Sequence, residues 1–219
     1  MKDIRLFSYK MTTDSGFAPN PFHGFLTLAN CKPNIRKSKK EDDWIAGFTS
    51  KELNGDLIGK ERLVYLMQVT NKIPYKDYWN DPLYKLKKPN LSSLQTIDKA
   101  GDNIYKPLKS NAELNTDFEQ IPNKNHDLKN KDHDLSEKNV LISKHYFYFG
   151  SSPIKIPKKI RPCIPVRQSA HGAKTHDLER ACKFIQYIQN NYHIGLINLP
   201  HKWPDESIIP LIRSNKKCG

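Results

Sequence analysis

The segment from Asp14 to Arg36, DSGFAPNPFHGFLTLANCKPNIR, constrains the fold more than any other part of the chain. It mixes prolines and glycines, which fix or bend the backbone, with three phenylalanines and several polar, reactive side chains. A regular core strand would not contain Pro19-Asn20-Pro21, and an ordinary surface loop has no need of three Phe. We therefore expect a rigid loop that forms a pocket against the rest of the molecule.

Strand patterns occur on both sides of this segment. Residues 3–10 alternate with apolar side chains on both faces, which indicates a buried strand. The segment RLVYLMQVT alternates most clearly, and VLISKHYFYF reads as one strand or as two strands that meet near Lys144. The strands predicted in addition to residues 3–10 are therefore 23–29, 44–48, 62–70 and 140–149.

One amphipathic helix is predicted near the C-terminus. Apolar residues recur at helical spacing from Leu178 to Gln189, and Asp177 precedes them as an N-cap. A shorter helical segment, YKDYWNDP, ends at Pro82. Several strands with one good helix predict an α+β fold, built on a small twisted β-barrel or sheet.

Residues 83–138 have a different composition, rich in Lys, Asn, Asp and Ser with few apolar residues. We interpret them as a long polar insertion, partly disordered, in a single domain that spans 1–219. Only 101–107 and 118–122 look ordered within it. The cluster NHDLKNKDHDL (125–135) could hold a metal ion, but we interpret it as a solvated loop and predict no metal site.

The charge of the chain suggests its partners. Lys and Arg exceed Asp and Glu by 36 − 23 = 13, so a polyanion is expected, DNA or a nucleotide first. Lysine-rich coding by an AT-rich genome would give the same excess. The chain lacks a membrane-length apolar run and a secretory signal, and its four cysteines form no CxxC pair. We expect a cytoplasmic protein that does not bind membranes; the sequence names no cofactor.

Several blocks resemble a known family. The segment 14–36, followed by DDWIAGFTS, RLVYLMQVT and YWNDP, is similar to the nucleotide modification associated domain 2 family of bacteria and their phages. The resemblance continues through GDNIYKP, VLISKHYFYFG and IPKKIRP. It implies a role near modified nucleotides, because the family's gene neighbourhoods contain DNA-base-modifying enzymes, and it supplies no established catalytic residues.

A fainter likeness concerns PUA-like domains such as EVE and ASCH. A basic connector, DDWIAGF, a turn and a strand ending in VTNK are similar to their pattern. The likeness implies a small β-barrel with an aromatic-lined pocket for a base. Asp42-Asp43 stands where that pattern has Gly-Asp.

Cys31, His23 and Asp14 are the candidates for catalysis. Cys31 lies beside Lys32, and nearby cations favour the thiolate that a nucleophile or methyl acceptor needs. His23 can carry a proton near neutral pH. The alternative for Cys31 is packing as a small hydrophobe. For Asp14 and Asn20 it is bonding of turn amides, and for His23 capping of a strand.

Other residues are candidates for contact with a nucleotide. Asn20 offers a donor and an acceptor to a base edge, and Arg161 suits phosphate oxygens. Trp44 and the run 146–149 offer aromatic rings for stacking, but core packing is their more common fate; one face of the run is expected in the core, and only the other is left open to a base. The predicted nucleotide-binding residues are Asn20, Phe22, Lys32, Arg36, Trp44 and Arg161.

These observations favour a protein that binds a nucleotide or nucleic acid and recognises a modified base in a pocket formed by 14–36. The alternative is an enzyme that makes, transfers or removes a base modification with Cys31, His23 and Asp14. A factor that binds a free nucleotide signal in phage defence is a third possibility. The chain has no P-loop, GxGxxG, GxSxG or HExxH motif, which removes the main support for four enzyme classes.

Overall fold

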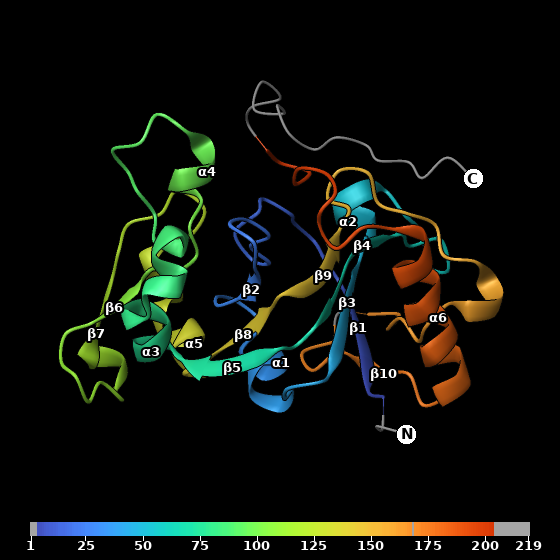
Figure 1. Ribbon diagram of the computed structural model, residues 1–219, viewed down its shortest axis with the longest axis horizontal. Helices are drawn as coiled ribbons and strands as arrows, with labels where there is room; N and C mark the ends of the chain where they lie inside the picture. The colour runs from blue at the N-terminus through green and yellow to red at the C-terminus, as the bar shows by residue number, and fades with distance from the viewer. Residues whose placement is uncertain (1–3, 168, 204–219) are drawn as a thin grey trace.

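The computed structural model describes residues 4–167 and 169–203, and its centre is an open six-stranded sheet (Figure 1). The strand order is β10-β1-β3-β4-β9-β11. Strands β1 and β3 are parallel, as are β9 and β11, whereas the other neighbours are antiparallel. The strands are β1 (Leu6–Lys10), β3 (Trp44–Phe48), β4 (Leu63–Gln68), β9 (His145–Tyr148), β10 (Ala173–Lys174) and β11 (Gly195–Leu196).

A second, three-stranded sheet has the order β2-β8-β5. Its strands are β2 (Leu26–Leu28), β5 (Asn71–Pro74) and β8 (Asn139–Ser143). The chain passes from β4 to β5 and from β8 to β9 through only one or two residues, so two nearly continuous stretches of strand join the two sheets (Figure 1). The two strands predicted to meet near Lys144 are confirmed, because Lys144 lies between β8 and β9.

Helix α6 (Leu178–Asn191) covers one face of the large sheet (Figure 1). Its apolar side, including Phe184 and Ile188, packs on β1, β3 and β4. Asp177 is the N-cap and accepts a hydrogen bond from the Arg180 backbone N–H at 2.9 Å. The amphipathic helix expected from the sequence is confirmed.

The other face of the large sheet packs on β2 and β8 and on helix α1 (Pro33–Ser38). Both faces of the sheet are therefore filled with core side chains. Tyr146 and Tyr148 belong to this second core, and Phe147 and Phe149 to the first. The core packing favoured for the run 146–149 is confirmed, because all four side chains are buried and neither face is available for stacking.

The segment 83–138 is packed against the second sheet (Figure 1). A core of aromatic and aliphatic side chains, including Tyr84, Ile104 and Tyr105, joins it to Phe17 and Phe25 of the N-terminal segment. The structure departs here from the partly disordered insertion that we expected, because these few large side chains anchor a polar sequence. Strands β6 (Tyr105–Pro107) and β7 (Phe118–Gln120) pair in this segment, within the two stretches expected to be ordered.

The remaining elements are short. They are helices α2 (Lys51–Asn54), α3 (Tyr75–Asn80), α4 (Thr96–Lys99) and α5 (Lys131–Asp134), and 3-10 turns η1 (Pro82–Lys87), η2 (Asn115–Asp117), η3 (Leu128–Asn130) and η4 (Lys158–Ile160).

The α+β class is as expected, but the sheet is open and does not confirm the closed barrel of PUA-like domains. None of the helices in the described part of the chain has the combined length and hydropathy of a membrane span.

Candidate functional site

Three separate segments surround a pocket of about 440 Å³, which we call the Cys31 pocket. The first segment is the start of α1, the second runs through η3 and α5, and the third is the loop before β10. The N-terminal segment singled out by the sequence therefore meets the polar segment 83–138 at this pocket. The lining residues are Cys31, Lys32, Asn34, Asn125, His126, Asn130, His133, Asp134 and Ala170.

The backbone holds Cys31 in an uncommon conformation. Cys31 and Lys32 have φ values of 56° and 45°, in the left-handed region that non-glycine residues seldom adopt. Pro33 then begins α1. The Cys31 carbonyl accepts a hydrogen bond from Arg36 Nε at 3.1 Å, and the Cys31 N–H donates to Asp134 Oδ1 at 2.7 Å. Both backbone groups of Cys31 are thus fixed, and its half-buried side chain lines the pocket.

Asp134 connects Cys31 to a histidine. Its carboxylate is fully buried, and its second oxygen, Oδ2, lies 2.7 Å from His126 Nε2. The Tyr105 hydroxyl donates to the same oxygen at 3.0 Å. A buried carboxylate needs such partners, because an unpaired charge is costly in the protein interior. We call Cys31, His126 and Asp134 the Cys31 centre.

His126 is positioned on several sides. Its ring stacks on Phe17 with centroids 5.1 Å apart, and only 8% of the residue is exposed. Burial lowers the pKa of His126, but hydrogen bonds to Asp134 and to the Cys31 thiol, together with the charges of both groups, raise it to about 9. His126 is therefore an imidazolium at neutral pH, next to a thiol and paired with a carboxylate.

The rest of the lining is polar. Within residues 4–167 and 169–203, the side-chain amides of Asn34, Asn125 and Asn130 have no hydrogen-bond partner. Lys32 is half-buried, with its ammonium 5.6 Å from the centroid of the Tyr9 ring. The pocket thus presents amide donors and acceptors, a cation and imidazole rings to whatever enters it.

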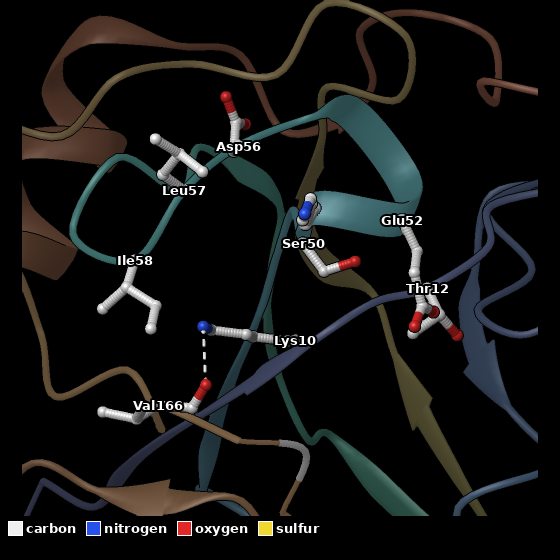
Figure 2. Close-up of a pocket in the computed structure, with 9 residues that line it drawn as sticks. Lys10, Thr12, Ser50, Glu52, Asp56, Leu57, Ile58 and Val166 are labelled. Atoms are coloured by element: carbon white, nitrogen blue, oxygen red, sulfur yellow. Dashed lines mark hydrogen bonds between the residues drawn. The ribbon is translucent and has the colours of Figure 1, made fainter.

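A second pocket, of about 520 Å³, lies between β1 and the chain around α2 (Figure 2). Its lysine, Lys10, donates to the Val166 carbonyl at 3.0 Å and pairs with Glu61 at 2.8 Å. The Ser50 hydroxyl accepts the Leu53 N–H as the cap of α2. Lys10 and Ser50 are thus engaged within the protein, and the rest of the polar lining, Thr12, Lys51, Glu52 and Asp56, contains neither a cysteine nor a histidine.

Asn20 is placed in the interior. Its amide donates to the Ala100 carbonyl at 2.9 Å, and its Oδ1 accepts from the fully buried Lys87 ammonium at 2.7 Å. Lys87 also donates to Thr27 Oγ1 at 3.2 Å, and Thr27 donates to Asp102 at 2.6 Å. We call these residues, with Tyr78, which also donates to Asp102, the Lys87 cluster.

Burial sets the pKa values of this cluster. It lowers the pKa of Lys87 to about 7, although Asp102 opposes the shift, and it raises the pKa of Asp102. Asn20 has all its side-chain atoms bonded within the protein, so the structure places it with the alternative that we considered, a structural amide.

Asp14 and His23 lie apart from Cys31. Asp14 is buried and accepts hydrogen bonds from the Tyr148 hydroxyl and from the His201 N–H. His23 has a φ of 58°, and burial followed by the charge of Lys87 lowers its pKa. Of the three catalytic candidates, only Cys31 lines the Cys31 pocket.

The residues predicted to bind a nucleotide lie in different parts of the structure. Phe22 is buried, with its ring centroid 4.7 Å from that of Trp203. Trp44 is buried in the core under α6, with one edge in a pocket of about 340 Å³ at the start of β3. Lys32 is the member of the predicted set that lines the Cys31 pocket.

The two arginines of that set are bonded within the protein. Arg36 is fully buried and donates to the carbonyls of Cys31, Asp134, Glu137 and Asn139. Arg161 pairs with Glu61 at 2.6 Å. Their planar donors are directed to protein oxygens, as a buried guanidinium requires.

His126 and Asp134 were not predicted as site residues. Both belong to the cluster 125–135 that we interpreted as a solvated loop, and that interpretation is wrong for these two buried residues. The apolar Leu135 directly after Asp134 is fully buried and was the available signal. Within the described residues, no group of three or more His, Cys, Asp or Glu side chains is arranged to hold a metal ion.

Comparison with known proteins adds the family. The chain belongs to the nucleotide modification associated domain 2 family, whose sequence model matches residues 3–207. The match covers both the N-terminal segment and the segment 83–138, and therefore every residue of the Cys31 pocket. No curated protein and no solved structure matches the chain.

Proposed function

We propose that this protein binds a nucleotide, free or within a nucleic acid, in the Cys31 pocket and takes part in its modification. The observation that carries the proposal is the set of unengaged amides of Asn34, Asn125 and Asn130 beside Lys32. The family to which the chain belongs is associated with nucleotide modification, and this supports the ligand class.

The lining suits the parts of a nucleotide. Side-chain amides present a paired donor and acceptor, which matches the edge of a base. The exposed ring of His133 offers a stacking surface, and Lys32 offers a charge to a phosphate. A volume of about 440 Å³ is in the range of small-molecule sites. The net charge of +13 favours approach of any polyanion.

The pocket differs from the one that the sequence suggested. The N-terminal segment contributes Cys31, Lys32 and Asn34, and 83–138 contributes the opposite wall. Recognition of a modified base is the finer part of the proposal. It is supported by the mixed amide and imidazole lining, which can contact substituents as well as ring edges.

Calorimetric titration with mononucleotides and a short single-stranded oligonucleotide tests the proposal. The double variant Asn125→Ala, Asn130→Ala is expected to bind about 30-fold more weakly, since each of the two lost hydrogen bonds is worth about 1 kcal/mol. Asn190→Ala, on the exposed side of α6, is the matched control and is expected to bind as the wild type. Equal affinity of the double variant and the control would contradict the proposal, as would absence of binding to every ligand.

Titration with base-modified and unmodified versions of the same nucleotide tests the finer part. Tighter binding of a modified form, lost in the double variant, is the expected outcome. Equal affinity for all forms would limit the function to general nucleotide binding.

A further inference from the structure

We infer that the Cys31 thiolate adds to ring carbon C6 of a pyrimidine nucleotide in the Cys31 pocket, with His126 as the proton donor and Asp134 as a positioning residue. The inference rests on the proposed function and deepens it by naming a reaction and a class of base.

The Cys31 sulfur is held in a fixed position at the pocket. Cys31 is held at its N–H by Asp134 and at its carbonyl by Arg36, in a left-handed conformation that costs energy. Strained backbone of this kind persists only where the surroundings fix it, and it occurs often at functional sites. The side chain itself is half-buried and lines the pocket, so a bound ligand can reach it.

His126 and Asp134 line the same pocket as the sulfur. Asp134 joins the two residues, because its Oδ1 accepts the Cys31 N–H and its Oδ2 lies 2.7 Å from His126 Nε2. A nucleophilic cysteine with a histidine partner that a third group orients is the general arrangement for covalent catalysis. Phe17 against the ring and Tyr105 on the carboxylate restrict any rotation of the pair.

The bonding of the Cys31 N–H favours addition to a conjugated ring over acyl transfer. Acyl transfer requires donors for an oxyanion next to the attacked carbon, and the amide of the nucleophile often provides one. Here the Cys31 N–H is already bonded to Asp134 Oδ1 at 2.7 Å. Addition to a conjugated ring moves the charge away from the attacked carbon to a ring oxygen or nitrogen. Side-chain amides and an imidazolium, the groups that line this pocket, can stabilise charge at that position.

The reactivity of the ring carbons favours a pyrimidine as the base. C6 of a pyrimidine is conjugated with the C4 carbonyl of uracil or with the corresponding C4–N3 bond of cytosine, and it accepts a thiolate. Purine rings have no carbon of equal reactivity in this sense. A nucleotide-binding pocket with a nucleophilic sulfur therefore fits a pyrimidine.

The step balances without any further reactant. For uracil, a sulfur lone pair forms the S–C6 bond, and the C5=C6 π pair shifts so that O4 takes the proton of His126. C5 then gains a proton from a water molecule, and the hydroxide that this leaves takes the O4 proton, so that the C4 carbonyl re-forms. In reverse, neutral His126 accepts the original C5 proton, the S–C6 bond breaks and the double bond re-forms. The net result is exchange of the hydrogen on C5 with solvent.

Proton NMR in D2O tests the inference with dUMP, dCMP and a pyrimidine oligonucleotide. The C5–H signal is expected to disappear with the wild-type protein and to persist with Cys31→Ser. His126→Gln is expected to slow exchange by roughly 100-fold, the contribution of a positioned general acid. Cys163→Ser, which alters an exposed thiol elsewhere, is the control and is expected to exchange at the wild-type rate.

A pH profile tests the role of Asp134. Exchange by the wild type is expected to fall above a pH of about 9, where His126 loses its proton. Asp134→Asn removes the charge that raises the pKa of His126, so the fall is expected at lower pH. A variant that merely loosened the fold would lower the rate at every pH without moving the profile.

The outcomes separate this inference from the proposed function. Binding of pyrimidine nucleotides without exchange would overturn the inference and leave the proposed function intact. Absence of binding would overturn both. Exchange that persists in Cys31→Ser would also overturn the inference. If Cys31→Ser failed to fold, as judged by circular dichroism, wild-type protein blocked at Cys31 with iodoacetamide replaces it.

Discussion

The Lys87 cluster and the Cys31 centre are built from similar groups and have opposite relations to solvent. Each contains a nitrogen base and a buried aspartate, in direct contact for His126 and Asp134 and linked through Thr27 for Lys87 and Asp102, and each joins the N-terminal segment to 83–138. In the Lys87 cluster every donor of the lysine is bonded to the protein interior. The Cys31 centre instead borders a pocket.

The two regions also differ in how the protein sets their protonation. Burial lowers the pKa of Lys87 to about 7, which favours the neutral form. In the Cys31 centre the partners outweigh burial and raise the pKa of His126 to about 9, which favours the charged form. The Lys87 cluster thus lies closed within the fold, whereas the Cys31 centre holds a charged imidazolium at the edge of a pocket.

The largest expected effect is on the closed cluster. Lys87→Met removes the lysine donor from four buried oxygens, of which the two of Asn20 keep a backbone N–H, so the free energy of unfolding is expected to fall by about 3 kcal/mol. Urea denaturation measures the change. Lys85→Met, an exposed neighbour in the same 3-10 turn, is the control and is expected to stay within about 0.5 kcal/mol of the wild type. Equal stability of the two variants would remove the structural role of the cluster.

A smaller loss is expected at the Cys31 centre. Asp134→Asn keeps one acceptor but loses the ion pair with His126, and we expect a loss of about 2 kcal/mol in urea denaturation. Asp132→Asn changes an exposed carboxylate in the same helix, α5, and is expected to have almost no effect. If Asp132→Asn were as harmful as Asp134→Asn, the importance of the buried carboxylate would be refuted.

The two regions are expected to respond to pH in opposite directions. His126 has a folded pKa of about 9, above its ordinary value of 6.5, so its stabilisation is full below 6.5 and is lost as pH rises through 9. Lys87 has a folded pKa of about 7, below its ordinary 10.5. Between 7 and 10.5 the unfolded chain binds the extra proton, and stability from this residue rises with pH.

Unfolding measured from pH 7 to pH 9 separates these contributions. The slope of the free energy of unfolding against pH is expected to be higher in His126→Gln than in the wild type by about 1 kcal/mol per pH unit. In Lys87→Met it is expected to be lower than in the wild type by a similar amount. Slopes that do not change in either variant would show that neither group titrates as described.

The smallest expected effect on stability belongs to Cys31 itself. The side chain is half-buried at a pocket, and its backbone groups make the bonds that hold the loop. Cys31→Ser is therefore expected to change the free energy of unfolding by less than about 0.5 kcal/mol. A loss of several kcal/mol would indicate that Cys31 is a core residue, the alternative raised by its sequence.

Much of the sheet and the long helix could be predicted from the sequence. Strand β3 and helix α6 follow from local periodicity, which is set by burial of one or both faces. Helix α1 was interpreted only as part of a basic connector over 32–40. It begins after Cys31 and Lys32, whose backbones adopt the left-handed conformation, and no local sequence pattern predicts that conformation.

The site could be predicted only in part. The N-terminal segment was recognised as the source of a pocket, and Cys31 and Lys32 line one. Their partners could not be found, because Asp134 is 103 residues from Cys31 along the chain and lies in a polar segment. Its burial depends on a few anchors such as Tyr105 and Leu135, whose packing is a tertiary property.

Alkylation of Cys31 in the presence of a nucleotide tests the central claim most directly. Iodoacetamide labelling, followed by peptide mass spectrometry, compares Cys31 in the pocket with the exposed Cys163 in the same sample. A pyrimidine nucleotide at saturating concentration is expected to slow labelling of Cys31 and to leave labelling of Cys163 unchanged. Unchanged labelling of Cys31 at a concentration where binding is complete would contradict the account, because the nucleotide would then occupy another part of the molecule.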